Sequence, residues 1–273
     1  MSTPRLLRAL TSRTSLTPAR RCLAGGLLAG SMALAIPAMV VPGTAGASAP
    51  ANVRTTVSSL KATASSLAAA GVGAVAPKCE SAITNRQTQI DVLNNRIAVA
   101  KWLTPSHHAT LSGDLSSASS GLSNLNGQIA AATTLKELGP LCKDIVNDYR
   151  IYVLRTPQVH LTIGGDAETT VVAKLQAIGP KLDSAIEAAQ AKGQDVGQAP
   201  SLYADFTAKV ADAASKSNGK SDQVIALTVD QYNAGSARPV LQSTYQDLVL
   251  GRGDLIAARQ DAQQIVQILK SLG

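Results

Sequence analysis

The most constraining feature of this sequence is a set of apolar stripes with the spacing of packed helices. Near the C-terminus an apolar residue recurs every seven positions: Leu241, Leu248, Leu255, Ala262 and Leu269. Similar stripes run through 83–100, 111–129 and 171–189. Such repeats place one face of a helix against its neighbours, and no comparable run has the alternation typical of strands. The sequence therefore predicts an all-α fold, an antiparallel bundle of long amphipathic helices with coiled-coil-like packing.

Breaks between the stripes predict where the helices end. Gly71, Gly73 and Pro77 predict the end of a first helix. The turn "LTPSHH" offers Thr104 as a cap and Pro105 in the first turn of the helix that follows. The predicted helices span about 50–70, 78–102, 105–131, a segment beginning near Leu141, 158–192, 200–216, 221–234 and 238–272.

The segment "DYRIYVLRTPQVHLTI" (148–163) has two interpretations. "RIYVL" and "VHLTI" on either side of a proline are compatible with a hairpin. An isolated hairpin inside a bundle leaves unpaired edges, so a helix that Pro157 kinks or divides is favoured. Its apolar residues point all round the helix, which indicates a buried central helix. The functional alternative is a ligand groove near Tyr149, Tyr152 and His160.

The first 49 residues have the pattern of an export signal. They begin with a basic region, continue with the apolar run "CLAGGLLAGSMALAIPAMVV" and end in small residues, with "AGA" and "ASA" as cleavage sites. We expect 1–49 to be the signal and cleavage region. We expect 50–273 to be a single helical-bundle domain, with a candidate sub-boundary near 193–200, and no transmembrane segment after cleavage.

The net charge argues against nucleic acid as a partner. The chain has 25 basic and 18 acidic residues, a net charge of +7. Five of the bases and none of the acids lie in the export signal, so the remainder carries 20 against 18, or +2. A nearly neutral chain with interspersed signs lacks the basic patch that nucleic-acid binding requires.

Two cysteines remain after the signal, and they predict one structural disulfide. An even pair in an exported chain usually forms a bridge. Cys79 and Cys142 would each lie near the start of a helix, at the same end of a three-helix unit. Two separate buried thiols are the alternative. No C-x-x-C redox motif is present.

The chemistry-bearing residues form no recognisable catalytic or metal site. His107 and His108 are adjacent, and Asp114 is too distant to complete a set, so both histidines are interpreted as exposed residues of a first helical turn. Asp144 and Asp148 share a helix face but have basic neighbours. No nucleophile elbow or phosphate-binding loop is found, so the sequence predicts no cofactor and no catalytic activity.

"GRGD" (251–254) contains the tripeptide Arg-Gly-Asp, which integrins recognise on mobile loops. Here it lies inside a seven-residue apolar repeat, between Leu248 and Leu255. The interpretation favoured is a local kink or a close helix crossing that Gly251 and Gly253 permit.

The run "DYRIYVLRTPQVHLTI", preceded by "LTPSHHATL", resembles a group of exported helical proteins of high-GC Gram-positive bacteria (Actinobacteria). The similarity covers about 78–190. It implies an extracytoplasmic compartment and a helical fold, and it assigns no activity and no catalytic residues. "GP" at 139–140 departs from the group's pattern.

These patterns lead to two functional expectations, with an enzyme of unfamiliar site as a third hypothesis. The first is an exported helical bundle that acts by binding or scaffolding at the cell envelope or outside the cell, with an unknown partner. The alternative is a lipid or peptide carrier with a cavity between helices near Tyr149, Tyr152 and His160.

Overall fold

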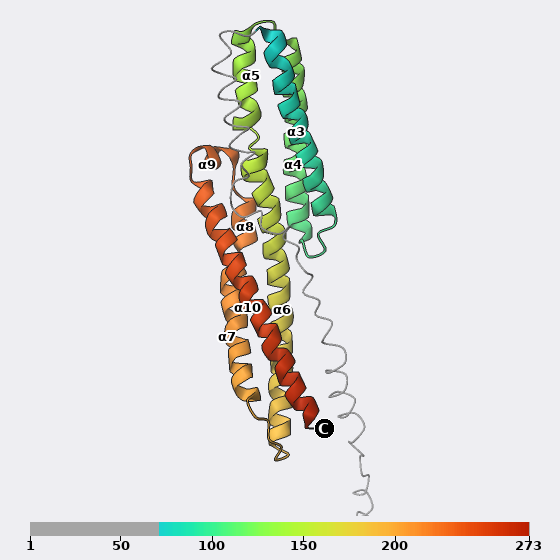
Figure 1. Cartoon of the computed structure of the whole chain (residues 1–273), viewed down its shortest axis with the longest axis vertical. Coiled ribbons are helices and arrows are strands. Elements are labelled where there is room, and N and C mark those ends of the chain that lie inside the picture. Colours follow the sequence, from blue (N-terminus) through green and yellow to red (C-terminus); the bar gives the residue numbers. More distant parts are fainter. Residues whose placement is uncertain (1–70, 273) are drawn as a thin grey trace, which may run out of the picture.

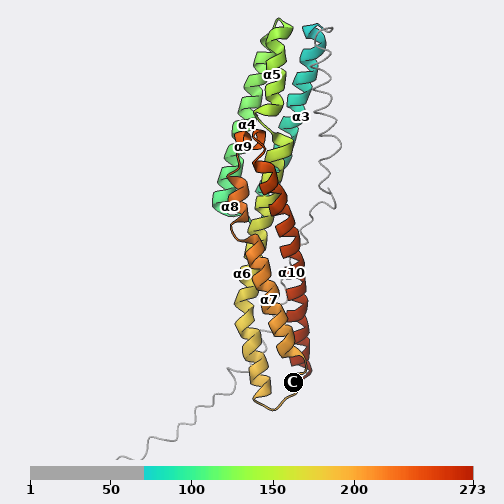
Figure 2. The same ribbon diagram turned by 90° about the vertical axis from the view of Figure 1, so that its left-hand side faces the viewer.

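The computed structural model of the protein describes residues 71–272, which form an elongated bundle of helices (Figure 1). The expected export signal and the expected first helix at 50–70 lie outside the described residues. Seen from two directions, the described chain forms two helical units that are staggered along the long axis and overlap in the middle (Figure 2). The all-α bundle predicted from the stripes is confirmed.

The upper unit in Figure 1 contains α3 (Val72–Ala98), α4 (Pro105–Ala131) and α5 (Leu135–Asn147). The predicted stripes of α3 and α4 face inward and are nearly inaccessible to solvent. The buried side chains include Ile83, Ile90, Ile97, Leu111, Leu115, Leu122 and Ile129. Each stripe leaves the polar residues of its helix on the outside, as expected for an amphipathic helix packed on one side.

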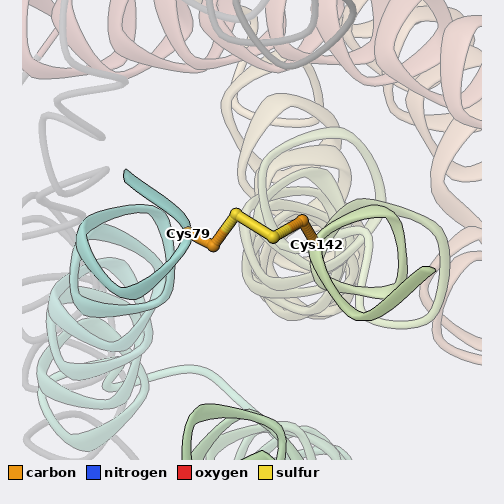
Figure 3. The surroundings of a disulfide bond; sticks show 2 residues. All are labelled: Cys79 and Cys142. Atoms are coloured by element: carbon orange, nitrogen blue, oxygen red, sulfur yellow. A yellow bond between two sulfur atoms is a disulfide. The ribbon is translucent and has the colours of Figure 1, made fainter. Parts of the chain in front are cut away.

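The predicted disulfide is present at the end of the upper unit. Cys79 on α3 and Cys142 on α5 are bonded, with their Cα atoms 5.6 Å apart (Figure 3). Both residues are buried in the core of that unit. The bridge therefore joins the first and third helices, as the predicted three-helix layout requires.

The lower unit contains α6 (Thr156–Gln190), α7 (Ala199–Ser217) and α10 (Ala237–Ser271). The helices α6 and α10 run downward in Figure 1, and α7 returns upward between them in sequence. A second apolar core fills this unit, with Phe206 its largest fully buried side chain. The loop near 193–200, the candidate sub-boundary, connects α6 and α7 at the lower end.

Two short helices lie beside the middle of the molecule. These are α8 (Lys220–Ile225) and α9 (Val229–Asn233), which connect α7 to α10. The sequence predicts a single helix over 221–234, and this prediction is wrong. Thr228 forms a capping box with Gln231, so a new helix begins there after the break at 226–227.

The predicted limits of α4 are confirmed, and those of its neighbours are not. α3 begins at Val72 and runs through Pro77, which lies in its second turn. α5 begins at Leu135, because Thr134 and Glu137 form a capping box before the Gly-Pro pair. In both helices a proline close to the N-terminus removes one hydrogen bond without ending the helix.

The segment 148–163 is helical, as favoured, but its break lies at Arg150 and not at Pro157. Arg150 has a φ of 44°, in the left-handed region that few residues other than glycine adopt. A π-helix, η1 (Ile151–Arg155), follows and leads directly into α6. Pro157 occupies the first turn of α6, a position that tolerates proline.

Among the described helices, none has a stretch that is both long enough and apolar enough to cross a lipid bilayer.

Candidate functional site at the waist

The lower end of the upper unit meets α6 halfway along the molecule, at a level we call the waist. The α3–α4 turn lies against α6 there. The ammonium of Lys174 lies 3.6 Å from the centre of the Trp102 ring, and the Thr104 amide donates a hydrogen bond of 2.8 Å to Asp166. Polar contacts therefore join the α3–α4 turn to α6 at the waist.

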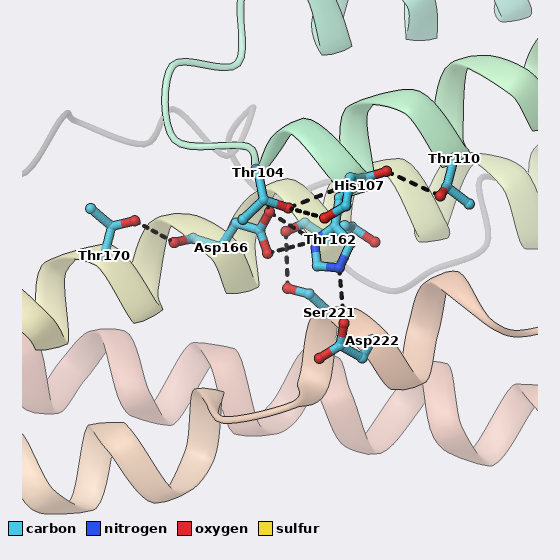
Figure 4. Close-up of polar contacts among 9 residues, drawn as sticks. Thr104, His107, Thr110, Thr162, Asp166, Thr170, Ser221 and Asp222 are labelled. Atoms are coloured by element: carbon cyan, nitrogen blue, oxygen red, sulfur yellow. Dashed lines mark hydrogen bonds and ion pairs between the residues drawn. The ribbon is translucent and has the colours of Figure 1, made fainter.

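His107 connects three helices at the waist (Figure 4). It lies in the first turn of α4, where its backbone N–H donates to the Thr104 side chain that caps the helix. Its ring Nδ1 is 2.9 Å from Asp166 on α6, and its Nε2 is 2.9 Å from Asp222 on α8. The interpretation of His107 as an exposed residue is wrong, because two carboxylates from distant parts of the chain enclose its ring. His108, by contrast, is exposed as predicted.

The two carboxylates favour the protonated form of His107. A neutral imidazole has one N–H and donates to one partner, whereas the imidazolium donates to both. Burial by itself lowers the pKa of His107, but the hydrogen bonds and charges of Asp166 and Asp222 together outweigh it, so the pKa is raised above 6.5. Asp166 is buried and Asp222 is largely exposed, with side-chain exposures of 4% and 77%.

Further polar groups hold α8 to α6 at the same level. The Ser221 hydroxyl donates to the Thr162 carbonyl (Figure 4). A Cβ added at Gly165 would collide with this hydroxyl. The buried amide of Gln158 donates to the carbonyls of Val224 and Leu227, at 3.0 and 2.8 Å. A Cβ at Gly165 would displace the Ser221 hydroxyl from the Thr162 carbonyl, while the backbone nitrogen and Cβ of Ser221 would lie at ordinary contact distances of 3.5 and 3.6 Å.

A buried carboxyl lies just below the waist. Glu168 on α6 is 2% exposed, and neither of its oxygens has a hydrogen-bond partner within the described part of the chain. Burial raises the pKa of Glu168 to about 8, against a smaller lowering by Arg252, whose Nε is 3.9 Å away. The Glu168 carboxyl abuts Gly251 of α10.

Gly251 confirms the close helix crossing predicted from "GRGD". A Cβ at this position would lie 3.1 Å from the Glu168 carboxyl, 3.5 Å from the Lys216 side chain and 3.7 Å from the Ala213 carbonyl. The Arg-Gly-Asp tripeptide lies inside the continuous helix α10. The glycine therefore serves the packing of α10 against α6 and α7.

The residues of the predicted groove lie against different helices. Tyr149 packs beside Gly121 of α4. The Tyr152 hydroxyl donates to the Asn85 carbonyl of α3, and the Arg86 guanidinium lies over its ring. His160 is half-buried near Arg96 of α3, and burial together with that charge lowers the pKa of His160 to about 4.

The acidic pair Asp144 and Asp148 lies at the C-terminal end of α5. Asp148 ends α5, and burial together with Asp144 raises the pKa of Asp148. Among the described residues, no group of three or more His, Cys, Asp or Glu side chains is arranged to hold a metal ion.

Sequence reasoning missed the waist because its members are far apart in the chain. His107 is 59 residues from Asp166 and 115 from Asp222. The available signal is indirect. Asp166 and Glu168 interrupt an otherwise apolar and small-residue stretch of a predicted buried helix, and buried acids require partners or protonation. Nothing in the sequence identifies His107 as that partner.

Comparisons with known proteins give no further assignment, since no family model, no curated protein and no solved structure matches this chain.

Proposed function

We propose that this chain is an exported helical-bundle protein of the actinobacterial type that acts by binding or scaffolding at the cell envelope, without catalytic activity. The disulfide supports an extracytoplasmic location, because such bonds persist in oxidising compartments. The signal-like pattern at 1–49 and the resemblance described above are the other grounds for export.

The observation that carries a binding role is the outer face of α10. Between 242 and 260 its exposed residues are all uncharged, and four of them are large and apolar. These four are Tyr245, Val249, Leu250 and Ile256. Val249 and Leu250 are more than half exposed, at 53% and 58%. A neighbouring group of apolar side chains on a surface is typical of a protein-contact site.

A carrier function has less support. The two tyrosines of the expected groove contact different helices, and the Tyr152 hydroxyl and ring already have partners on α3. A groove that binds a lipid or peptide would need these side chains to converge on one open space.

Cell fractionation tests both parts of the proposal. The full chain, produced in an actinobacterial host, should lose its first residues near 48–50 and be recovered with the envelope. Leu250→Glu, which puts a charge in the apolar face of α10, should move most of the protein to the medium. Gln264→Glu, an exposed position on the same helix, should behave as the wild type.

Two outcomes would contradict the proposal. Retention of the uncut chain inside the cell would contradict export. Identical fractionation of the wild type and Leu250→Glu, with equal thermal stability, would contradict a contact through α10.

A further inference from the structure

The segment 220–234, which we call the strap, crosses the waist between two glycine hinges. It contains α8 and α9. Gly219 before it and Gly235 after it have φ angles of 68° and 88°, in the left-handed region where glycine carries little strain. Both ends of the strap are therefore backbone positions with more conformational freedom than their neighbours.

Side chains of the strap and of the elements around it both dock the strap. Gln158 donates to its carbonyls, and Arg150 donates to Asn233 at 2.6 Å. The Asn233 amide in turn donates to the Asn147 carbonyl, at 3.0 Å. Beneath it, Val224 and Leu227 are buried against an apolar cluster that includes Leu154, Leu161, Leu241 and Leu248.

One of the docking contacts depends on a proton. Asp222 is held to α4 through the Nε2 of His107, and that nitrogen donates when the ring is protonated. When the ring is neutral, the buried Asp166 retains the remaining N–H, because it also accepts from Thr104 and cannot turn to solvent. The Nε2 lone pair then faces the Asp222 carboxylate, and the exposed Asp222 side chain turns away.

We propose that the strap is a pH-sensitive cover, held over the apolar cluster while His107 is protonated and loosened when His107 loses its proton. The charged groups around the ring are consistent with this role. Asp166 faces it from α6, Asp222 faces it from α8, and the adjacent His108 on α4 is exposed. Lys220, at the start of the strap, pairs with Asp247 of α10.

The change has a defined direction. Because the two carboxylates hold the pKa of His107 above 6.5, the contact between α4 and the strap is complete below pH 6.5 and is lost as the pH rises through the raised pKa of the folded chain. The strap therefore opens toward higher pH and exposes the apolar cluster beneath it. This regulation does not depend on the proposed export or on the α10 surface.

Hydrogen exchange of the full chain at pH 6 and pH 8.5, corrected for intrinsic exchange rates, tests the proposal. Amides of 220–234 should open severalfold more often at the higher pH, because the contact between His107 and Asp222 is lost when the ring loses its proton. His107→Gln and Asp222→Asn should abolish this difference. His108→Gln, which alters the exposed neighbour, should preserve it.

Two further measurements assign the pH response to the His107 ring. In Glu168→Gln, which removes the buried carboxyl below the waist, the strap should keep the same pH-dependent exchange as in the wild type. A titration of the His107 ring by NMR should show a lower pKa in Asp222→Asn than in the wild type, even if His107→Gln folds poorly.

The proposal is overturned if the strap is equally protected at both pH values in the wild type. It is also overturned if Asp222→Asn keeps the full pH dependence, because the contact that carries the mechanism is then absent.

Discussion

At the scale of single residues, Glu168 is the clearest case of an ionisable side chain in an environment that disfavours its charge. Its carboxyl is buried between α6 and α10 without a hydrogen-bond partner among the described residues, and Arg252 lies near but beyond hydrogen-bond distance. A buried carboxylate without hydrogen bonds is costly, and burial outweighs the effect of Arg252, so the group is protonated around neutral pH. The fold tolerates this residue at some cost in stability.

Replacing Glu168 by Gln should therefore stabilise the protein, and more so in alkaline solution. The pKa of Glu168 is about 8 in the folded chain and 4.5 ordinarily, so the native state binds the extra proton. Binding of this proton stabilises the native state relative to the ionised carboxylate. This stabilisation is complete below pH 4.5 and is lost as the pH rises through 8. Denaturant unfolding at pH 5 and pH 9 should show a larger gain for Glu168→Gln at pH 9.

Glu187→Gln provides the matched control, because Glu187 is an exposed carboxyl on the same helix. Equal effects of the two substitutions at pH 9 would show that burial of Glu168 does not govern the stability of α6.

His107 shows the limit of prediction at this scale. Its place in the first turn of α4 follows from Thr104 and Pro105, and both residues are recognisable in the sequence as helix-start signals. Its environment depends on the packing of α4 against α6 and α8, which no local pattern encodes. The cysteine pair was predictable because a disulfide has only one available combination when two cysteines remain.

At the scale of elements, the success of a prediction depended on which signal marked each helix end. The limits of α4 were predicted correctly because a cap, a proline and an uninterrupted stripe agree. For α3 and α5 a proline was interpreted as a boundary, although both helices begin five residues before it. The break at Arg150 left no sequence signal, since arginine rarely adopts a positive φ.

The two glycines of "GRGD" should respond differently to alanine. Gly253 has nothing within 4 Å of an added Cβ, so Gly253→Ala should stabilise α10 by about 0.5–1 kcal/mol through helix propensity alone. Gly251→Ala should stabilise it less or destabilise it, because its Cβ meets the Glu168 carboxyl and the Lys216 side chain. Thermal unfolding of the two variants measures the difference.

A larger gain at Gly251 than at Gly253 would show that α10 does not cross α6 and α7 as closely as described.

At the scale of the whole molecule, the two units differ in how they are stabilised. The upper unit has the Cys79–Cys142 bridge. The lower unit has the most extensive contact between any two of the described helices, that of α7 with α10. This contact includes the ion pairs Lys209–Asp261 and Lys216–Asp254. Such partly exposed pairs usually contribute little. The stability of the lower unit therefore comes mainly from its apolar core.

Removal of the disulfide should act first on the upper unit. The loop it closes predicts a loss of roughly 4 kcal/mol in the double variant Cys79→Ala, Cys142→Ala. Hydrogen exchange should increase most in α3, α4 and α5, and least in the lower part of α6 and in α7. A uniform increase along the chain would contradict independent contributions of the two units.

The described chain begins at one end of the molecule and finishes at the opposite end (Figure 1). Val72 begins α3 at the upper end, and α10 finishes at Ser271 at the lower end. Helix α6 alone, with its 35 residues, spans about 52 Å. A group joined before Val72 and another joined after Ser271 would thus be kept far apart, with the continuous helix α6 as the spacer between them.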